Sequence, residues 1–145
     1  MLTKQTKPVL LSTQVLLATY WPQIEPLLAS APVAEEHAPD KILELALAGQ
    51  LFVFAIVKET LDGDEVELVV VLAPVPSDTL PVMTVVVVAG KNLRRHIRDY
   101  WDFFQGWCVM SGARAIDAYV PDRMEGFVEK LLGLKRETVH VRLRL

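Results

Sequence analysis

The sequence predicts an α/β (α+β) fold in which a mixed central sheet is flanked by helices. Residues 83–132 carry the first observation: a buried apolar strand, a long amphipathic helix, a second strand and a second helix follow one another there. The run 51–57 is apolar on both faces, which is typical of a strand covered on both sides. An Asp-Gly turn signal at 62–63 then returns the chain as a hairpin. At 145 residues we expect a single domain, residues 1–145.

The elements are expected in the order β-α-α-β-β-β-α-β-α-β. The expected strands are residues 8–11, 51–57, 65–73, 83–88, 114–120 and 137–145. The expected helices are residues 14–30, 39–47, 92–111 and 121–132. Because proline breaks a helix interior, Pro22 and Pro26 should divide the first helix into two short pieces near Trp21. In the last strand apolar and polar residues alternate, which predicts one buried face and one cationic face.

The helix 92–111 has the strongest pattern. Apolar residues recur at three- and four-residue steps along one stripe, and they are Leu93, Ile97, Tyr100, Trp101, Phe104, Trp107 and Cys108. Asn92 can cap its start, and Gly112 can end it in a left-handed conformation. The lone cysteine of the chain, Cys108, is on this stripe, so we expect a core residue and not a nucleophile.

Basic residues crowd the start of this helix, where the helix dipole is already positive. They are Lys91, Arg94, Arg95, His96 and Arg98. Such crowding costs stability unless an anion binds there or acidic residues one turn on compensate, in the pairs Arg95–Asp99 and Arg98–Asp102. The cluster is therefore either an anion site or a solvated charged face, and the sequence favours neither.

Charge and hydropathy exclude some classes of function. No apolar run reaches the roughly 18 residues of a membrane helix, and residues 1–7 hold no signal-peptide core. The net charge of −3 combines about −7 over residues 1–90 with about +4 over residues 91–145. A polarised molecule can dock with charged neighbours or with its own copies. The absence of a long apolar run leads us to expect no membrane partner. The acidic balance makes a nucleic-acid-binding module that uses the basic helix start the least favoured reading.

The sequence contains no motif of a metal site, a nucleophilic serine or a phosphate-binding loop. His37, His96 and His140 are scattered without the ligand spacing of a zinc site, so we expect no metal. There is no Gly-x-Ser-x-Gly elbow and no Gly-Lys-Ser/Thr phosphate loop. We assign no catalytic residue.

The element order and the run Gly126–Leu134 (GFVEKLLGL) resemble the GCN5-related N-acetyltransferase (GNAT) family. The run is similar to the family's Phe-Tyr-Glu-Lys-Leu-Gly-Phe helix end. Ala89-Gly90, the aromatic helix with Trp107, and the run 111–113 look most like the acetyltransferase-like proteins of tailed phages, some of which are virion components.

Two departures from the family pattern decide what this resemblance implies. Family members hold the pyrophosphate of acetyl-CoA in a loop Gln/Arg-x-x-Gly-x-Gly/Ala, whereas this chain has one usable glycine there. Val128 stands where many members carry a tyrosine that acts as general acid. If CoA binds, the residues expected to hold it are Val88, Ala89, Gly90, Lys91, Asn92, Arg94 and Arg95.

We therefore expect a non-catalytic, virion-associated protein, made in the host cytoplasm, that uses a GNAT-like scaffold for interaction and needs no cofactor. Its partners would be other virion proteins or its own copies. The residues expected to dock are Lys91, Arg94, Arg95, Arg98, Arg142 and Arg144. The alternative is a cytoplasmic, acetyl-CoA-dependent N-acyltransferase of unknown substrate.

Overall fold

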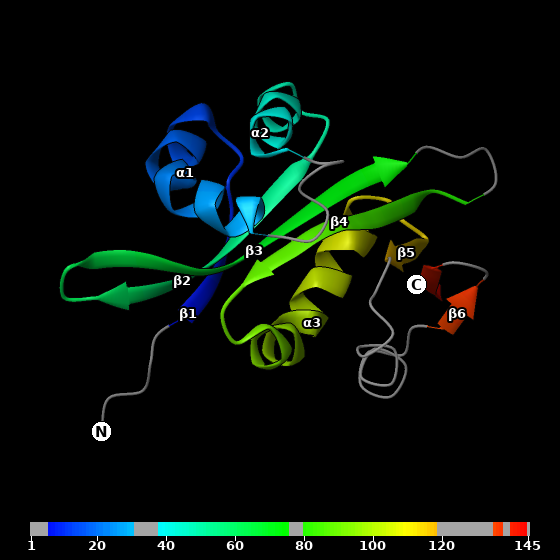
Figure 1. Ribbon diagram of the computed structural model, residues 1–145. Coiled ribbons are helices and arrows are strands. Elements are labelled where there is room, and N and C mark those ends of the chain that lie inside the picture. Colours follow the sequence, from blue (N-terminus) through cyan, green and yellow to red (C-terminus); the bar gives the residue numbers. More distant parts are fainter. Residues whose placement is uncertain (1–5, 31–37, 76–79, 119–134, 138–139, 145) are drawn as a thin grey trace. The chain divides into compact units, whose positions relative to one another are not determined.

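A computed structural model describes residues 6–30, 38–75, 80–118, 135–137 and 140–144 (Figure 1). Its elements in chain order are β1 (Thr6–Leu10), α1 (Gln14–Ala29), α2 (Pro39–Leu47), β2 (Phe52–Thr60), β3 (Gly63–Val75), β4 (Val82–Gly90), α3 (Leu93–Met110), β5 (Ala115–Ala118), β6 (Lys135–Glu137) and β7 (His140–Arg144). The order from the first strand to 118 is the predicted one. The predicted helix 121–132, with Val128, lies outside the described residues.

The described strands form one mixed sheet in the order β1-β2-β3-β4-β5-β7-β6. β4 and β5 run parallel, while β1 with β2, β5 with β7, and β6 with β7 run antiparallel. A mixed sheet was the predicted fold class, and it is confirmed. By its internal contacts the chain divides into two compact units, residues 1–71 with 87–96, and residues 72–86 with 97–145.

The first unit is built on the hairpin of β2 and β3. The central residues of both strands are buried on both faces, as the apolar run 51–57 predicted. β1 pairs antiparallel with β2, with Thr6 opposite Lys58 and Leu10 opposite Phe54. Helices α1 and α2 lie over the same face of this hairpin (Figure 1). The largest side chains buried in this core include Ile24, Leu28, Ile42, Phe54, Ile56 and Leu68.

The prediction that prolines break the first helix is wrong, because α1 is continuous from Gln14 to Ala29. Pro22 and Pro26 lie one turn apart and are both exposed, so the carbonyl groups that lose partners belong to solvent-facing residues. The opposite face is buried and packs the helix against the core through Leu17, Trp21, Ile24 and Leu28. Tertiary packing therefore outweighs the poor helix propensity of proline.

The second unit holds most of α3, with β5 and the C-terminal strands. Ile97, Phe104 and Cys108 on the predicted stripe are buried, and Cys108 is 1 % exposed, which confirms it as a core residue. The helix ends before Gly112, whose φ of +94° is the predicted left-handed conformation. Met83 pairs with Ile116 in the parallel ladder of β4 and β5.

The predicted final strand 137–145 is wrong at its start. Glu137 belongs to β6, which pairs antiparallel with β7 so that Glu137 lies opposite His140. Three residues are too few to show a two-residue period, so the sequence pattern did not separate β6 from β7. Separately, none of the helices described is long and apolar enough to cross a membrane.

Candidate functional site

The connection between β4 and α3 is only two residues long, because β4 ends at Gly90 and α3 begins at Leu93. Gly90 has φ of +142°, and a Cβ placed on it would lie 2.2 Å from the carbonyl oxygen of Glu67. Only glycine permits this close approach of two backbone segments. Asn92 has φ of +53°, in the left-handed region that asparagine tolerates better than most residues. Together Gly90 and Asn92 turn the chain from the strand into the helix.

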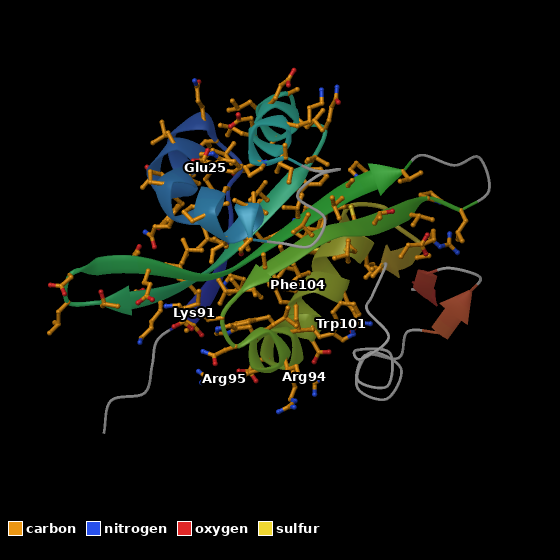
Figure 2. The ribbon with its side chains drawn as sticks, in the orientation of Figure 1. Glu25, Lys91, Arg94, Arg95, Trp101 and Phe104 are labelled. Atoms are coloured by element: carbon orange, nitrogen blue, oxygen red, sulfur yellow. The ribbon has the colours of Figure 1, made fainter. Side chains whose placement is uncertain are left out.

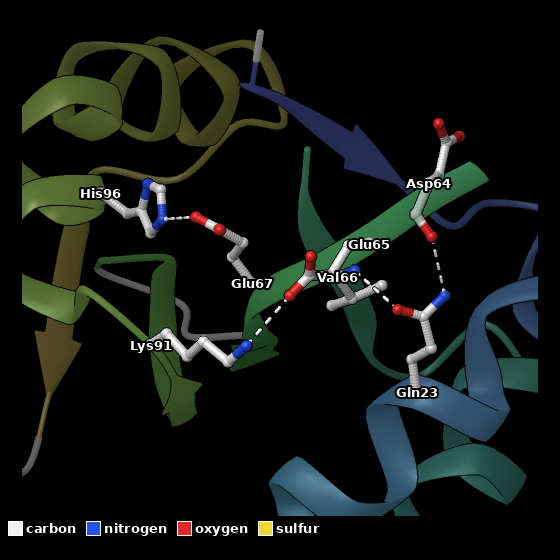
Figure 3. A network of polar contacts seen from close by, with 7 residues as sticks. All are labelled: Gln23, Asp64, Glu65, Val66, Glu67, Lys91 and His96. Carbon is white, nitrogen blue, oxygen red and sulfur yellow. Dashed lines mark hydrogen bonds and ion pairs between the residues drawn. The ribbon is translucent and has the colours of Figure 1, made fainter. Parts of the chain in front are cut away.

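Glu67, on β3, contacts this junction twice. Its backbone carbonyl accepts a hydrogen bond of 2.7 Å from the Lys91 N–H. Its carboxylate Oε1 lies 2.8 Å from Nε2 of His96, in the first turn of α3 (Figure 3). The side chains of His96 and Glu67 are only 1 % and 5 % exposed. A buried ionisable group is tolerated when it is bonded to a partner, so this pair ties β3 to the start of α3.

Glu65 makes a second, more exposed contact with the same junction. Its Oε1 lies 3.0 Å from Lys91 Nζ, and the two side chains are 40 % and 64 % exposed. The hydrogen bond to Glu65, and then the charge of Glu65, raise the pKa of Lys91. Glu65 and Glu67 are two residues apart on one strand, so their side chains leave the same face of the sheet. Two carboxylates therefore lie beneath the junction and bind its two ends, at Lys91 and His96.

The exposed cations Lys91, Arg94 and Arg95 gather around the start of α3 (Figure 2). Asn92 occupies the cap position, since its carbonyl accepts a 3.0 Å hydrogen bond from the His96 N–H. The N–H groups of the first helical turn lie outside the helix's own hydrogen-bond ladder. They add to the positive end of the dipole, so this end of the helix has the charge and the donors that suit a phosphate group. Capping by the Asn92 side chain stays a prediction.

The structure brings together all seven residues expected to hold a cofactor. Val88–Gly90 end β4, Lys91-Asn92 form the connection, and Arg94 and Arg95 open α3. Ala89 is buried and Val88 half-buried, so neither is freely exposed. Of the other docking residues, Arg98 is exposed one turn along α3. Arg142 and Arg144 lie on β7, and their side chains are outside the described part of the chain.

Two features of the predicted basic cluster need correction. His96 is not part of a solvated cluster, because it is buried against Glu67. The pairs Arg95–Asp99 and Arg98–Asp102 are not among the ion pairs formed by the described residues. The acidic partners come instead from β3 and lie 26 and 29 residues before the basic residues that they contact, so helical spacing gave no sign of them.

Sequence reasoning therefore missed Glu65 and Glu67. A signal existed in the run 65–71, where two glutamates at a two-residue step are the only polar residues of an otherwise apolar stretch. That pattern places both acids on one face of a strand and marks them as candidates for specific partners.

Helix α1 makes hydrogen bonds to residues 64–66 of β3, next to the two glutamates (Figure 3). The Gln23 side chain accepts a hydrogen bond from the Val66 N–H at 2.8 Å and donates to the Asp64 carbonyl at 3.0 Å. Tyr20 donates to the Asp64 carboxylate at 3.0 Å, and burial followed by this contact raises the pKa of Tyr20. Residues 64–67 of β3 are thus held by α1, through Asp64 and the Val66 N–H, and by the junction, through Glu65 and Glu67.

No group of three or more His, Cys, Asp or Glu side chains within the described part of the chain could hold a metal ion. The groups exposed at the start of α3 are cations and backbone N–H groups, which can bind an anion.

Known proteins were compared with the chain by sequence and by structure. No protein-family model matches the sequence, and no curated protein matches it. Among solved structures, FeeM, an N-acyl amino acid synthase from uncultured soil microbes, has a TM-score of 0.70 at 8% identity and covers 98% of this chain and 91% of its own. An acetyltransferase from Trypanosoma brucei has a TM-score of 0.66 at 16% identity, covering 97% and 100%.

A GNAT family acetyltransferase from Brucella melitensis, solved in complex with acetyl-CoA, has a TM-score of 0.64 at 14% identity and covers 97% of this chain and 88% of its own. At such low identity the likeness concerns the fold alone. The mixed sheet and its flanking helices belong to one known architecture: this chain has the GNAT acetyltransferase fold.

Proposed function

We propose that this protein is an acetyl-CoA-dependent N-acyltransferase that binds the diphosphate of the thioester at the start of α3. The observation that carries the proposal is the junction itself. Gly90 and Asn92 turn the chain so that the amide-rich end of α3 follows β4 directly, with Lys91, Arg94 and Arg95 exposed around it. The likeness to a fold seen with acetyl-CoA in the Brucella melitensis protein supports the same ligand.

The residues of the junction fit a diphosphate in charge more than in backbone geometry. The Lys91 N–H is already bonded to the Glu67 carbonyl, so it does not donate to a ligand. The close approach to Glu67 also requires Gly90, which therefore serves the protein's own packing. The groups that would contact a diphosphate are the exposed side chains of Arg94 and Arg95 and the N–H groups of the first turn of α3. Lys91 would have to share its amino group with Glu65.

The thioester would supply the activated acyl group, and the chain's described residues would bind and orient it. Arg94 and Arg95 would neutralise the diphosphate, and the helix dipole would favour the same charge. No described residue is assigned as general base or acid. The proposal therefore concerns the ligand and the reaction class, and the acyl acceptor stays open.

A second candidate is a non-catalytic protein that uses the same scaffold to bind other proteins. The two-residue connection favours it, because so short a turn leaves little backbone to wrap a diphosphate. Under this proposal the exposed cations Lys91, Arg94, Arg95 and Arg98 meet acidic neighbours, together with Arg142 and Arg144 of β7. The comparisons do not bear on a virion-associated role, which stays a prediction.

Calorimetric titration of the full chain with CoA and acetyl-CoA tests the two candidates. The acyltransferase proposal expects saturable binding, and ligand at 100 times its Kd should raise the free energy of unfolding by about 2.7 kcal/mol. Arg94→Glu should abolish binding, because it places a carboxylate against the diphosphate. Lys41→Glu makes the same charge change on α2 and should leave binding intact. Lack of binding at millimolar CoA would reject the acyltransferase proposal and would favour the second candidate, a non-catalytic protein that binds other proteins.

A further inference from the structure

We propose that Glu67 is a positioning residue, whose carboxylate sets the orientation of the first turn of α3 through His96 and so aligns the anion-binding end of the helix. The inference rests on the proposed function, since that function says which end of α3 meets the ligand. Glu67 itself would not touch the ligand. Its effect passes through His96, one residue beyond Arg95.

The first step of the argument is that contacts with Glu67 bracket the anion-binding segment. The Glu67 carbonyl bonds the Lys91 N–H at 2.7 Å, on the strand side of this segment. The Glu67 carboxylate bonds His96 Nε2 at 2.8 Å, on the helix side (Figure 3). Residues 92–95 lie between these two anchors and include both arginines assigned to the diphosphate. One residue of β3 therefore holds both ends of the segment that would meet the ligand.

The second step concerns why a polar pair is buried at this place. Glu67 is 4 % exposed and His96 is 1 % exposed, and both are among the few buried polar residues of the described chain. Apolar residues of similar volume often stabilise a protein as well as a buried ion pair does, so stability alone gives no reason for this pair. A hydrogen bond differs from an apolar contact in being directional, because it fixes both a distance and an angle. The N–H groups at a helix end can converge on one ligand only if the helix is held at a fixed orientation, and a directional bond supplies that restraint.

The third step is a contrast within the same strand. Glu65 projects from the same face of β3 and contacts the same junction, but its pair with Lys91 is exposed. Exposed pairs are screened by water and hold geometry weakly. Substitution of Glu65 therefore removes a carboxylate beside the junction without removing a buried anchor, and it is the matched control for Glu67.

The test compares four variants by CoA affinity and by resistance to urea. Glu67→Gln keeps an oxygen that can accept from His96, so its Kd should stay within about twofold of wild type. Glu67→Leu should weaken CoA binding by about tenfold, because a tilted helix start would lose about one charge-assisted hydrogen bond from Arg94 or Arg95 to the diphosphate. The double variant Glu67→Leu/His96→Leu replaces the pair with apolar packing. Its urea midpoint should therefore return to that of wild type, while its CoA affinity should stay as weak as that of Glu67→Leu. Glu65→Leu, the same change at the exposed carboxylate, should bind CoA at least as tightly as wild type, because it removes the partner that competes for Lys91.

Two results would overturn the positioning role: an unchanged Kd in Glu67→Leu, or a double variant that regains affinity and stability together. If wild type binds no CoA, the proposed function fails, and amide hydrogen exchange still tests the inference. Residues 91–97 should then exchange faster in Glu67→Leu and in the double variant than in wild type and Glu67→Gln. Equal exchange in all four proteins would reject the role of Glu67 independently of any ligand.

Discussion

Replacing Gly90 with alanine tests the geometry of the junction most directly. The new Cβ would lie 2.2 Å from the Glu67 carbonyl oxygen and 2.7 Å from Leu68 Cα, and both of these are backbone atoms that cannot rotate away. A φ of +142° is also a region that L residues avoid, at a cost of roughly 1–3 kcal/mol. Moving the strands apart would break the bond from the Lys91 N–H to Glu67, which is worth about 0.5–1.5 kcal/mol.

Together these effects predict that Gly90→Ala lowers the free energy of unfolding by about 1.5–4.5 kcal/mol. The melting temperature should fall on the order of 10 °C for a chain of this length. Urea denaturation, followed by tryptophan fluorescence and by circular dichroism, measures the free energy, and agreement of the two probes supports two-state analysis. CoA binding should weaken as well, since the start of α3 loses its strand-side anchor.

Two other glycines separate the causes. Gly63 has φ of +115° with nothing within 4 Å of an added Cβ, so Gly63→Ala carries the backbone strain without the collision. Gly106 lies inside α3 with open space around it, so Gly106→Ala should stabilise the protein by about 0.5–1 kcal/mol. If Gly90→Ala costs no more than Gly63→Ala, the close approach to Glu67 is not what requires glycine.

Three further predictions concern stability and reactivity. Gln23→Met keeps the side-chain volume but loses the bonds to Val66 and Asp64, so urea denaturation should show a loss of about 1–3 kcal/mol. Pro22→Ala restores an N–H inside an exposed helix turn and should raise the free energy of unfolding by up to about 3 kcal/mol. Calorimetry should then show a higher melting temperature, and a lower one would show that α1 needs the proline. Burial raises the pKa of the Cys108 thiol to about 11, above its ordinary 9.0. Because the unfolded thiol ionises first, the free energy of unfolding should fall as pH rises from 9 towards 11, and Cys108→Ala should remove that part of the pH dependence. Thiol reagents at neutral pH should react only after urea is added.

The secondary structure between 39 and 112 could be predicted because its signals are local. Proline opened α2 and Gly49 followed its end, the apolar run 51–57 marked a buried strand, and helical periodicity marked α3. The basic residues at the start of α3 break the rule for a helix N-terminus, and on that ground the sequence predicts either an anion site or a solvated charged face there. The predicted break in α1 failed because local propensity is weaker than burial of a whole helix face.

The sequence by itself determined the kind of fold, the position of the junction and the positive charge around it, since each of these follows from the order of residue types along the chain. Only the tertiary structure decided what that charge is bonded to. Glu67 and His96 are 29 residues apart, and no periodicity links a strand residue to a helix residue at that separation. The same is true of position 90, where only glycine fits because the Glu67 carbonyl of the neighbouring strand β3 lies so close. Contacts between distant segments depend on how the chain folds in three dimensions, and that folding turned a cluster of five basic residues into one buried pair, one exposed pair and the surface arginines.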